Sequence, residues 1–299
     1  MQALDHDQAV QPRRRGLSPE ELSNVETVYR PDLLRGRNFL VSGGGSGMGR
    51  ATTFLITRLG GQVTICGRNE DKLAAAASDI KRLLGREIHY KAMTIRDPAQ
   101  VESLMAETFD RYGSLDALVN SAGGQFPQQA IDFSVKGWNA VVDTNLNGTW
   151  WMMQAAARQW RDRNQPGSIV NIVTTFDRGT PQSAHTAAAR AGVVYLSKSV
   201  AVEWAPLHIR VNCIAPGNTV TEGLDQYPDE YVERFAAGNP MQRAGDTLDL
   251  AQAVVYLSAA SGKWITGTVL HVNGGMHLWG TNWPLGMPDH FKTRKGDTS

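Results

Sequence analysis

Cysteine is scarce in this chain: Cys66 and Cys213 are the only two among 299 residues, and they lie far apart. Two distant cysteines supply neither the framework of a disulfide-rich fold nor the ligands of a zinc cluster, and no other pattern predicts a metal site. Both stand in apolar segments typical of strands, so we expect two buried thiols that act as small hydrophobic side chains. Such usage is typical of a reducing compartment, and we expect a cytoplasmic protein.

The chain also lacks an excess of charge and a long apolar run. Its 30 Lys and Arg residues are balanced by 29 Asp and Glu residues, which gives a net charge of +1. This balance gives no reason to expect a nucleic acid or a membrane surface as a partner. No apolar run is long enough to cross a bilayer. The first residues do not resemble a signal peptide, and residues 295–299 carry no peroxisomal or retention signal. The expected partner is a small molecule.

Glycine, by contrast, is concentrated in one segment. Residues 42–49 read Ser-Gly-Gly-Gly-Ser-Gly-Met-Gly, after an apolar run that predicts a strand and before an amphipathic run that predicts a helix. Glycines let the backbone approach a pyrophosphate, and the helix N-terminus offers free N–H groups and partial positive charge. A glycine turn alone can be purely structural. In this context it predicts a dinucleotide site with contacts from Gly43, Ser46, Gly47 and Met48.

Strands and helices alternate along the rest of the chain. This alternation predicts an α/β protein with a single-domain, Rossmann-type, doubly wound parallel sheet. We expect a polar, loosely ordered arm over 1–30, a reductase domain over 31–277 and a tail over 278–299 that packs on a neighbouring subunit. The predicted strands are 38–41, 62–66, 87–95, 115–119, 167–173, 209–215 and 269–272. The predicted helices are 50–59, 69–84, 97–112, 138–161, 185–205 and 248–258.

Several motifs in register resemble the short-chain dehydrogenase/reductase family. After the glycine loop come Asn120-Ser121-Ala122-Gly123, Asn145-Leu146-Asn147-Gly148, Pro216-Gly217 and Val272-Asn273-Gly274-Gly275, in the family's order. The resemblance covers about residues 34–276. Within the family, segments 120–126, 136–138 and 185–193 are most similar to peroxisomal-type trans-2-enoyl-CoA reductases, with the 2,4-dienoyl-CoA reductases as the next neighbours.

The resemblance also implies which cofactor is bound. An acidic residue after the second strand would accept hydrogen bonds from a ribose 2′-hydroxyl and repel a 2′-phosphate. This chain has Gly67-Arg68 there, and an arginine can bind that phosphate through two charge-assisted bonds. We therefore expect NADPH, although Arg68 could also be an ordinary solvated side chain. Further contacts implied by the resemblance are Ile95 at the adenine; Asn120, Ala122, Gly123 and Arg190 along the ribose; and Pro216, Gly217 and Thr219 near the nicotinamide.

The chain departs from the family at the catalytic positions. Members that act on alcohols or ketones use a Tyr, a Lys, a Ser and an Asn, whereas this chain has Thr186, Arg190, Thr174 and Asn145. A threonine hydroxyl is too weak an acid to protonate an alkoxide near neutral pH. Arginine is a fixed cation that still binds ribose hydroxyls. Reduction of an alkene conjugated to a thioester chiefly needs donors aimed at the thioester oxygen, so these residues favour that reaction.

The proton donor is less clearly indicated. Tyr195 lies on the same predicted helix as Arg190, and we include it among the candidate catalytic residues. His185 and Asp177 are alternatives, and each of the three also has an ordinary structural interpretation.

The substrate side is expected over residues 219–243. That region is acidic, and Arg234 and Arg243 are its evident cations, which argues for an acyl carrier protein or a free enone as well as coenzyme A. Phe126 and one of Trp150 and Trp151 could line an apolar pocket.

The leading hypothesis is an NADPH-dependent reductase of enoyl or dienoyl thioesters. The alternatives are a carbonyl reductase or alcohol dehydrogenase with an unusual donor, and a non-catalytic NADP-binding protein. The resemblance implies a homotetramer whose interfaces use helices 138–161 and 185–205.

Overall fold

The computed structural model describes residues 15–225 and 229–278, together with Pro284, Pro288 and Phe291. In this part of the chain, seven strands form one wholly parallel sheet in the order β3-β2-β1-β4-β5-β6-β7. This confirms the predicted fold class. The strands are β1 Asn38–Ser42, β2 Gln62–Gly67, β3 His89–Ala92, β4 Ala117–Asn120, β5 Gly167–Ile172, β6 Ile209–Pro216 and β7 Val269–Val272.

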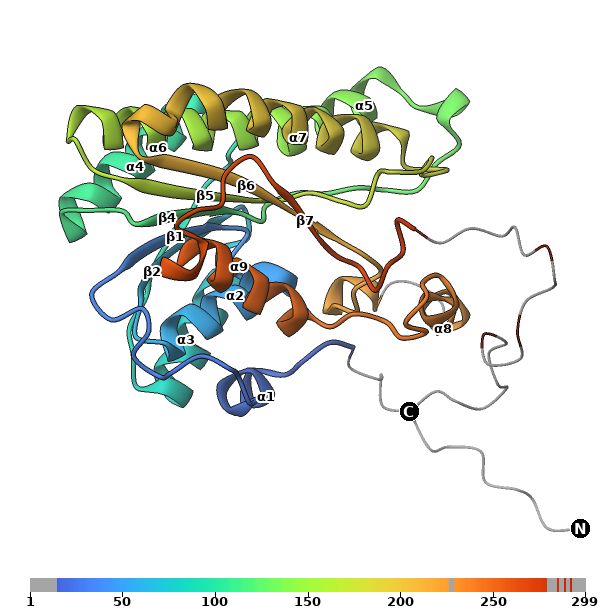
Figure 1. Ribbon diagram of the computed structural model, residues 1–299, viewed down its shortest axis with the longest axis horizontal. Helices are drawn as coiled ribbons and strands as arrows, with labels where there is room; N and C mark the ends of the chain where they lie inside the picture. The colour runs from blue at the N-terminus through green and yellow to red at the C-terminus, as the bar shows by residue number, and fades with distance from the viewer. Residues whose placement is uncertain (1–14, 226–228, 279–283, 285–287, 289–290, 292–299) are drawn as a thin grey trace, which may run out of the picture.

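Helices cover both faces of the sheet (Figure 1). On one face lie α1 and α3 with the closely packed pair α2 and α9, and on the other lie α4, α6 and α7. Because neither face meets water, the central strands β1, β4 and β5 are buried along their whole length, whereas the edge strand β3 is only partly buried. The helices are α1 Pro19–Asn24, α2 Gly47–Arg58, α3 Glu70–Leu84, α4 Pro98–Tyr112, α5 Val135–Val142, α6 Thr149–Asp162, α7 Ala184–Trp204, α8 Asp229–Ala237 and α9 Thr247–Ser258.

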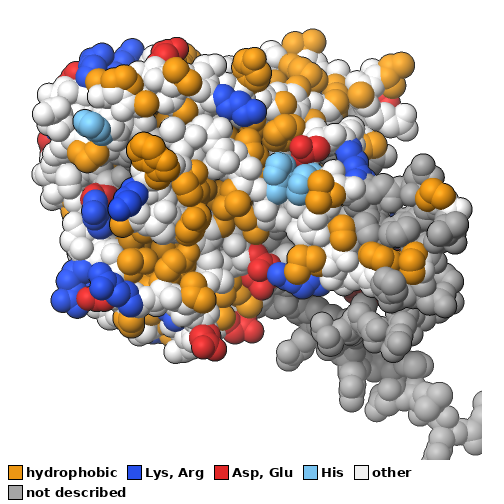
Figure 2. Space-filling model, viewed as in Figure 1, with side chains coloured by type: hydrophobic (Ala, Val, Ile, Leu, Met, Phe, Trp, Pro, Cys, Tyr) orange, Lys and Arg blue, Asp and Glu red, His pale blue; other side chains and the backbone are white. Residues whose placement is uncertain are grey.

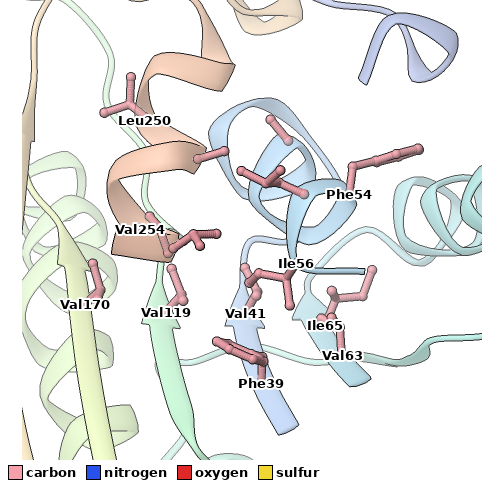
Figure 3. Close-up of a cluster of buried hydrophobic side chains, with 14 of the residues drawn as sticks. Phe39, Val41, Phe54, Ile56, Val63, Ile65, Val119, Val170, Leu250 and Val254 are labelled. Atoms are coloured by element: carbon pink, nitrogen blue, oxygen red, sulfur yellow. The ribbon is translucent and has the colours of Figure 1, made fainter. Parts of the chain in front are cut away.

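The core beneath the glycine loop joins four central strands to two helices (Figure 3). Its side chains are at most 2% exposed, so the first strand and the helix that follows the glycine loop are held as one rigid unit. They are Phe39 and Val41 of β1, Val63 and Ile65 of β2, Val119 of β4, Val170 of β5, Phe54 and Ile56 of α2, and Leu250 and Val254 of α9.

The cysteines are as expected. Cys66 lies in β2 and Cys213 lies in β6, and both are free and buried. Burial raises the pKa of Cys66 to about 12 and that of Cys213 to about 11, so both remain thiols at neutral pH.

The N-terminal segment differs from the expected loose arm. Ser18 caps α1 with a reciprocal capping box to Glu21, and Leu22 is only 2% exposed. The hydroxyl of Tyr29 donates to the carbonyl of Gln252 at 2.8 Å. Arg58 donates to carbonyls of this segment at 3.1 and 2.7 Å. The prediction of loose order was therefore wrong for residues 15–30; residues 1–14 and most of the tail lie outside the described residues.

Two element boundaries were also predicted wrongly. The strand predicted over 87–95 pairs only over His89–Ala92, because the chain then turns towards the Asp97 cap of α4. The single helix predicted over 138–161 contains a π-helical turn, Asp143–Gly148, between α5 and α6. Hydrophobic periodicity detects helical segments but not a local change from i→i−4 to i→i−5 bonding.

Trp160 offers a test of the packing between α6 and the sheet. Its side chain is fully buried, and Nε1 donates to the carbonyl of Leu115 at 2.6 Å. Trp160→Phe leaves that carbonyl without its donor and a void beside Gly167, so we expect the free energy of unfolding in urea to fall by about 2–4 kcal/mol. The same substitution at Trp264, which is 93% exposed, should change it by less than about 0.5 kcal/mol. Equal losses at the two positions would contradict this packing.

Candidate active site

The glycine loop forms a tight cradle at the carboxyl end of β1. Gly43 has φ +72°, and a Cβ there would lie 2.8 Å from the backbone nitrogen of Ala122. A Cβ at Gly49 would lie 2.2 Å from the carbonyl oxygen of Gly43. Ser46 is the N-cap of α2, but its side chain makes no capping bond. The first N–H groups of α2, at Gly47 and Met48, are therefore available to a ligand or to another part of the chain.

The carboxylate of Glu222 binds to this cradle. The backbone N–H of Gly47 donates to Oε1 of Glu222 at 2.8 Å, although the two residues lie 175 positions apart. A carboxylate at the start of α2 is what the helix dipole and the free N–H groups favour. The loop therefore has the donor chemistry that a cofactor diphosphate requires.

A buried amide network lies under the neighbouring loop. Nδ2 of Asn120 donates to Oδ1 of Asn171 at 2.8 Å, and Nδ2 of Asn171 donates to Oγ of Ser197 at 2.9 Å. The backbone N–H of Ala122 donates to Oγ of Ser42 at 3.3 Å. The side chain of Asn120 thus joins strand ends instead of facing a ligand. Sequence reasoning missed Asn171 and Ser197, whose one signal is a polar residue inside an apolar segment.

Two of the predicted adenosine contacts lie at the ends of strands beside the cradle. Arg68 follows β2, is exposed, and makes no hydrogen bond or ion pair with any described residue. Ile95 is 5% exposed and packs on Gly148, where a Cβ would lie 2.7 Å from Cγ1 of Ile95. Arg68 is thus available to a ligand, whereas Ile95 is a buried side chain that packs against Gly148.

Asn145 lies in the π-helical turn and is 1% exposed. Its Oδ1 accepts from the backbone N–H of Gly124 at 3.0 Å, and its Nδ2 donates to the carbonyl of Gly124 at 3.0 Å. Both ends of the amide are therefore used to hold the loop after β4. Asn145 orients this loop, and one of the two N–H donors of its Nδ2 is used to do so.

Arg190 is the buried cation of the site. It is 6% exposed; Nη2 donates to the carbonyl of Ala122 at 3.1 Å, and Nη1 donates to the carbonyl of Asn145 at 3.4 Å. None of the described carboxylates forms a salt bridge with it. Burial lowers the pKa of Arg190 to about 10, so it stays charged at neutral pH. The loop and the π-helical turn thus meet at one unpaired positive charge.

Thr186 lies one helical turn before Arg190, on the same face of α7. It is 8% exposed, and its Oγ1 is buried without a hydrogen-bond partner among the described residues. Thr174 follows β5 and also makes no hydrogen bond there; the preceding Val173 packs with Val193 of α7. Two threonine hydroxyls therefore remain free as donors.

His185 is enclosed by aromatic rings and is fully buried. Its ring stacks on Phe133 at 4.4 Å between centroids and meets Phe126 edge to face at 4.7 Å. Nδ1 accepts from the backbone N–H of Thr186 at 2.8 Å, which leaves the proton of the neutral ring on Nε2, an atom without a partner among the described residues. Phe126 therefore packs on His185, and its place in a substrate pocket stays a prediction.

The structure does not bring Tyr195 to this site. It is 75% exposed, because nine residues at about 100° each place it on the face of α7 opposite Thr186. It therefore contacts none of the groups above and is not retained as a catalytic residue. Trp150 and Trp151 do not line a pocket either, since both pack within the helical layer and Trp150 stacks on Trp204 at 6.2 Å between centroids.

Asp177 belongs to a chain of polar contacts at the end of β7. Its Oδ2 accepts from Nε2 of His271 at 3.2 Å, and the ring of His271 stacks on that of His277 at 4.0 Å between centroids. Figure 2 shows histidine and acidic surface side by side on this face of the molecule. Asn273 then links this cluster to Thr175, which bonds the carbonyl of Pro216. Asp177 is thus part of a scaffold behind the predicted nicotinamide contacts.

A cavity of about 300 Å³ lies at the carboxyl ends of β6 and β7. It includes Gly217 and Thr219, but none of Asn145, Thr186 and Arg190. Gly217 lies against Asn273, where a Cβ would be 2.8 Å from its Cα. A larger cavity of about 780 Å³ lies at the amino ends of the strands, whereas the glycine loop lies at their carboxyl ends.

One of the two cations on the expected substrate side is paired. Arg243 forms a bidentate salt bridge with Asp249, with N–O distances of 2.8 and 3.0 Å, and this pairing raises the pKa of Arg243. In the part of the chain that the structure describes, no group of three or more His, Cys, Asp or Glu side chains could hold a metal ion. Each helix described is too short or too polar to span a bilayer.

The chain is similar to known reductases along most of its length. Residues 43–277 match the family model described as Enoyl-(Acyl carrier protein) reductase. The chain is 35% identical to the peroxisomal 2,4-dienoyl-CoA reductase of Saccharomyces cerevisiae, over 86% of this chain and 89% of the yeast protein. It is 33% identical to the 3-oxoacyl-(acyl-carrier-protein) reductase of Staphylococcus aureus, over 81% of this chain and 98% of that protein. The solved structure of the citronellol catabolism dehydrogenase of Pseudomonas aeruginosa matches with a TM-score of 0.75 and 31% identity, over 84% of this chain and 99% of that one.

The fit of Arg190 against the loop can be tested at two adjacent glycines. A Cβ at Gly123 would lie 2.1 Å from Nη2 of Arg190, whereas one at Gly124 would meet nothing within 4 Å. We expect Gly123→Ala to lower the free energy of unfolding by about 1–3 kcal/mol, because the guanidinium must leave its carbonyls. Gly124→Ala should change it by less than about 1 kcal/mol. Denaturant unfolding of both variants decides the point, and equal effects would count against the observed packing.

Proposed function

Because the chain belongs to the short-chain dehydrogenase/reductase family, whose members bind nicotinamide cofactors, we propose that it is an NADPH-dependent reductase of the carbon–carbon double bond in an enoyl or dienoyl thioester. One observation carries the choice of reaction. The site gathers a buried cation and free threonine hydroxyls, while the tyrosine on the same helix is exposed on its far side. That donor set suits an oxyanion better than it suits an alkoxide that must be protonated.

The described residues fit a dinucleotide. The glycine cradle and the first N–H groups of α2 suit the diphosphate, and Gly47 already binds a carboxylate. Arg68 supports the choice of NADPH, because it is exposed, unpartnered and placed after β2, where an acid would select NADH. Pro216 ends β6, and Gly217 and Thr219 follow it and line the 300 Å³ cavity. These three residues would hold the nicotinamide.

The chemistry divides between cofactor and protein. The bound nicotinamide would supply a hydride to the β-carbon of an enoyl thioester or the δ-carbon of a dienoyl thioester. Negative charge then develops on the thioester oxygen, and the hydroxyls of Thr186 and Thr174 are the free donors for it. Arg190 adds a fixed positive charge and does not move a proton, because its pKa remains far above neutral pH. The proton added to the chain carbon would then come from water, because the ring of His185 is fully buried between Phe126 and Phe133.

A carbonyl reductase is the second candidate, and the similarity to the 3-oxoacyl reductase supports it. The test is oxidation of NADPH with crotonyl-CoA, a 2,4-dienoyl-CoA, a 3-oxoacyl thioester and simple ketones. Deuterium from labelled NADPH should appear on a saturated chain carbon. Label on a carbinol carbon would overturn the proposal. Tight NADPH binding without turnover of the whole panel would favour a non-catalytic NADP-binding protein.

We further propose a cytoplasmic homotetramer. The outer face of α7 supports the assembly, because Tyr195 and Val202 are 75% and 78% exposed there. Figure 2 shows a second apolar area over the face that carries α9. The two reduced, buried cysteines support a reducing compartment.

Arg68 gives the sharpest test of cofactor choice. Arg68→Ala should raise the dissociation constant for NADPH about 10- to 100-fold and leave that for NADH within about twofold, because a charge-assisted contact contributes about 1.5–3 kcal/mol. The matched control is Arg86→Ala. Arg86 is an exposed arginine that precedes the neighbouring strand β3, so it lies at the amino ends of the strands, whereas Arg68 lies at their carboxyl ends. Both constants can be measured by fluorescence titration. Equal losses for NADPH and NADH would contradict a 2′-phosphate contact.

A further inference from the structure

The contact between Glu222 and the glycine loop joins two regions with different expected tasks. Glu222 begins a short 3₁₀ turn, Glu222–Leu224, inside the region expected on the substrate side. Its Oε1 lies 2.8 Å from the backbone nitrogen of Gly47 and 3.6 Å from Nη2 of Arg50. Its side chain is 27% exposed. The carboxylate therefore occupies the start of α2, where the cradle is built for an anion.

The N-terminal segment braces this turn from the other side. Arg15 donates to the carbonyl of Leu224 and pairs with Asp229 of α8. Arg50 donates to the carbonyl of Leu17 at 3.1 Å. A Cβ at Gly16 would lie 3.3 Å from the backbone of Thr221 and Glu222. In Figure 1 the segment before α1 runs towards the end of the molecule that carries α8. The position of Glu222 is thus held by packing and two arginines.

We propose that Glu222 is an internal competitor for the cofactor diphosphate, which must displace it from Gly47; this inference rests on the dinucleotide site proposed above. A diphosphate and a carboxylate are both anions, so they cannot share the N–H groups at one helix N-terminus without repulsion. Displacement moves the charge of Glu222 off the loop together with the 222–224 turn. Binding of the dinucleotide is thereby coupled to the segment on the substrate side, and the free protein keeps its anion site filled.

Binding of NADP⁺ and NAD⁺ to the full chain, measured by calorimetry, tests the competition. Glu222→Gln removes the charge with little change in shape, and Glu222→Ala removes the side chain. Both should bind NADP⁺ and NAD⁺ about 3- to 10-fold more tightly than the unmodified protein, because a carboxylate at a helix N-terminus contributes on the order of 1 kcal/mol that the ligand must otherwise overcome. Adenosine 2′-monophosphate, which lacks the diphosphate, should bind all three proteins equally.

Asp225→Asn is the matched control, since it removes one exposed carboxylate three residues away on the same segment. It should leave all affinities within about twofold. Unchanged or weaker NADP⁺ binding by folded Glu222 variants overturns the inference, as does an equal gain in Asp225→Asn. If neither the unmodified protein nor any variant binds a dinucleotide, the proposed function fails and the inference with it. The Glu222 variants could bind both dinucleotides more tightly while Arg68→Ala weakens NADPH and NADH binding equally. That result would support the inference and refute only the choice of NADPH.

Discussion

The buried guanidinium of Arg190 is the constraint around which the site is arranged. A cation removed from water is costly unless polar groups replace its hydration, and here the replacements are two backbone carbonyls, those of Ala122 and Asn145. Each carbonyl needs special backbone geometry. The first requires a glycine at 123, where a side chain would overlap the guanidinium. The second lies in the π-helical turn, whose carbonyls do not follow the regular α-helical pairing.

This arrangement also explains why Asn145 and Arg190 act together. Asn145 holds Gly124 with both ends of its amide, while its own carbonyl accepts from Arg190. A shift of any one of the three segments would leave a buried polar group without a partner. The result is a rigid site whose positive charge is fixed in place. With a pKa of about 10, the Arg190 guanidinium stays charged at neutral pH and contributes its field and its donors.

Most of the fold follows from local patterns, because strand and helix periods, caps and glycine turns are short-range signals. The glycine loop and the parallel sheet could be predicted in this way, whereas the roles expected of Thr186 and Arg190 came from the family resemblance. Three features could not be predicted in this way: the Asn120–Asn171–Ser197 network, the aromatic enclosure of His185 and the contact of Glu222 with Gly47. Each depends on contacts between segments 26 to 175 residues apart, about which periodicity carries no information. Tyr195 was misplaced for a simpler reason: proximity in sequence on a helix does not mean a shared face.

The charges at the glycine loop and at Arg190 differ in their pairing. Arg190 has no carboxylate partner among the described residues, whereas the free N–H of Gly47 has acquired one in Glu222. A dinucleotide bound as proposed would bring phosphate charge to the glycine loop and leave Arg190 without a carboxylate partner. An oxyanion forming on the substrate would then supply the negative charge that Arg190 lacks in the free protein. Ketone reduction needs a proton on the carbonyl oxygen itself, whereas reduction of a thioester-conjugated alkene places its proton on a chain carbon and leaves the oxygen to be stabilised by donors and charge. In the proposed reaction the unpaired cation would stabilise the transition state, in which the oxyanion forms, more than the uncharged ground state, which is the condition for catalysis.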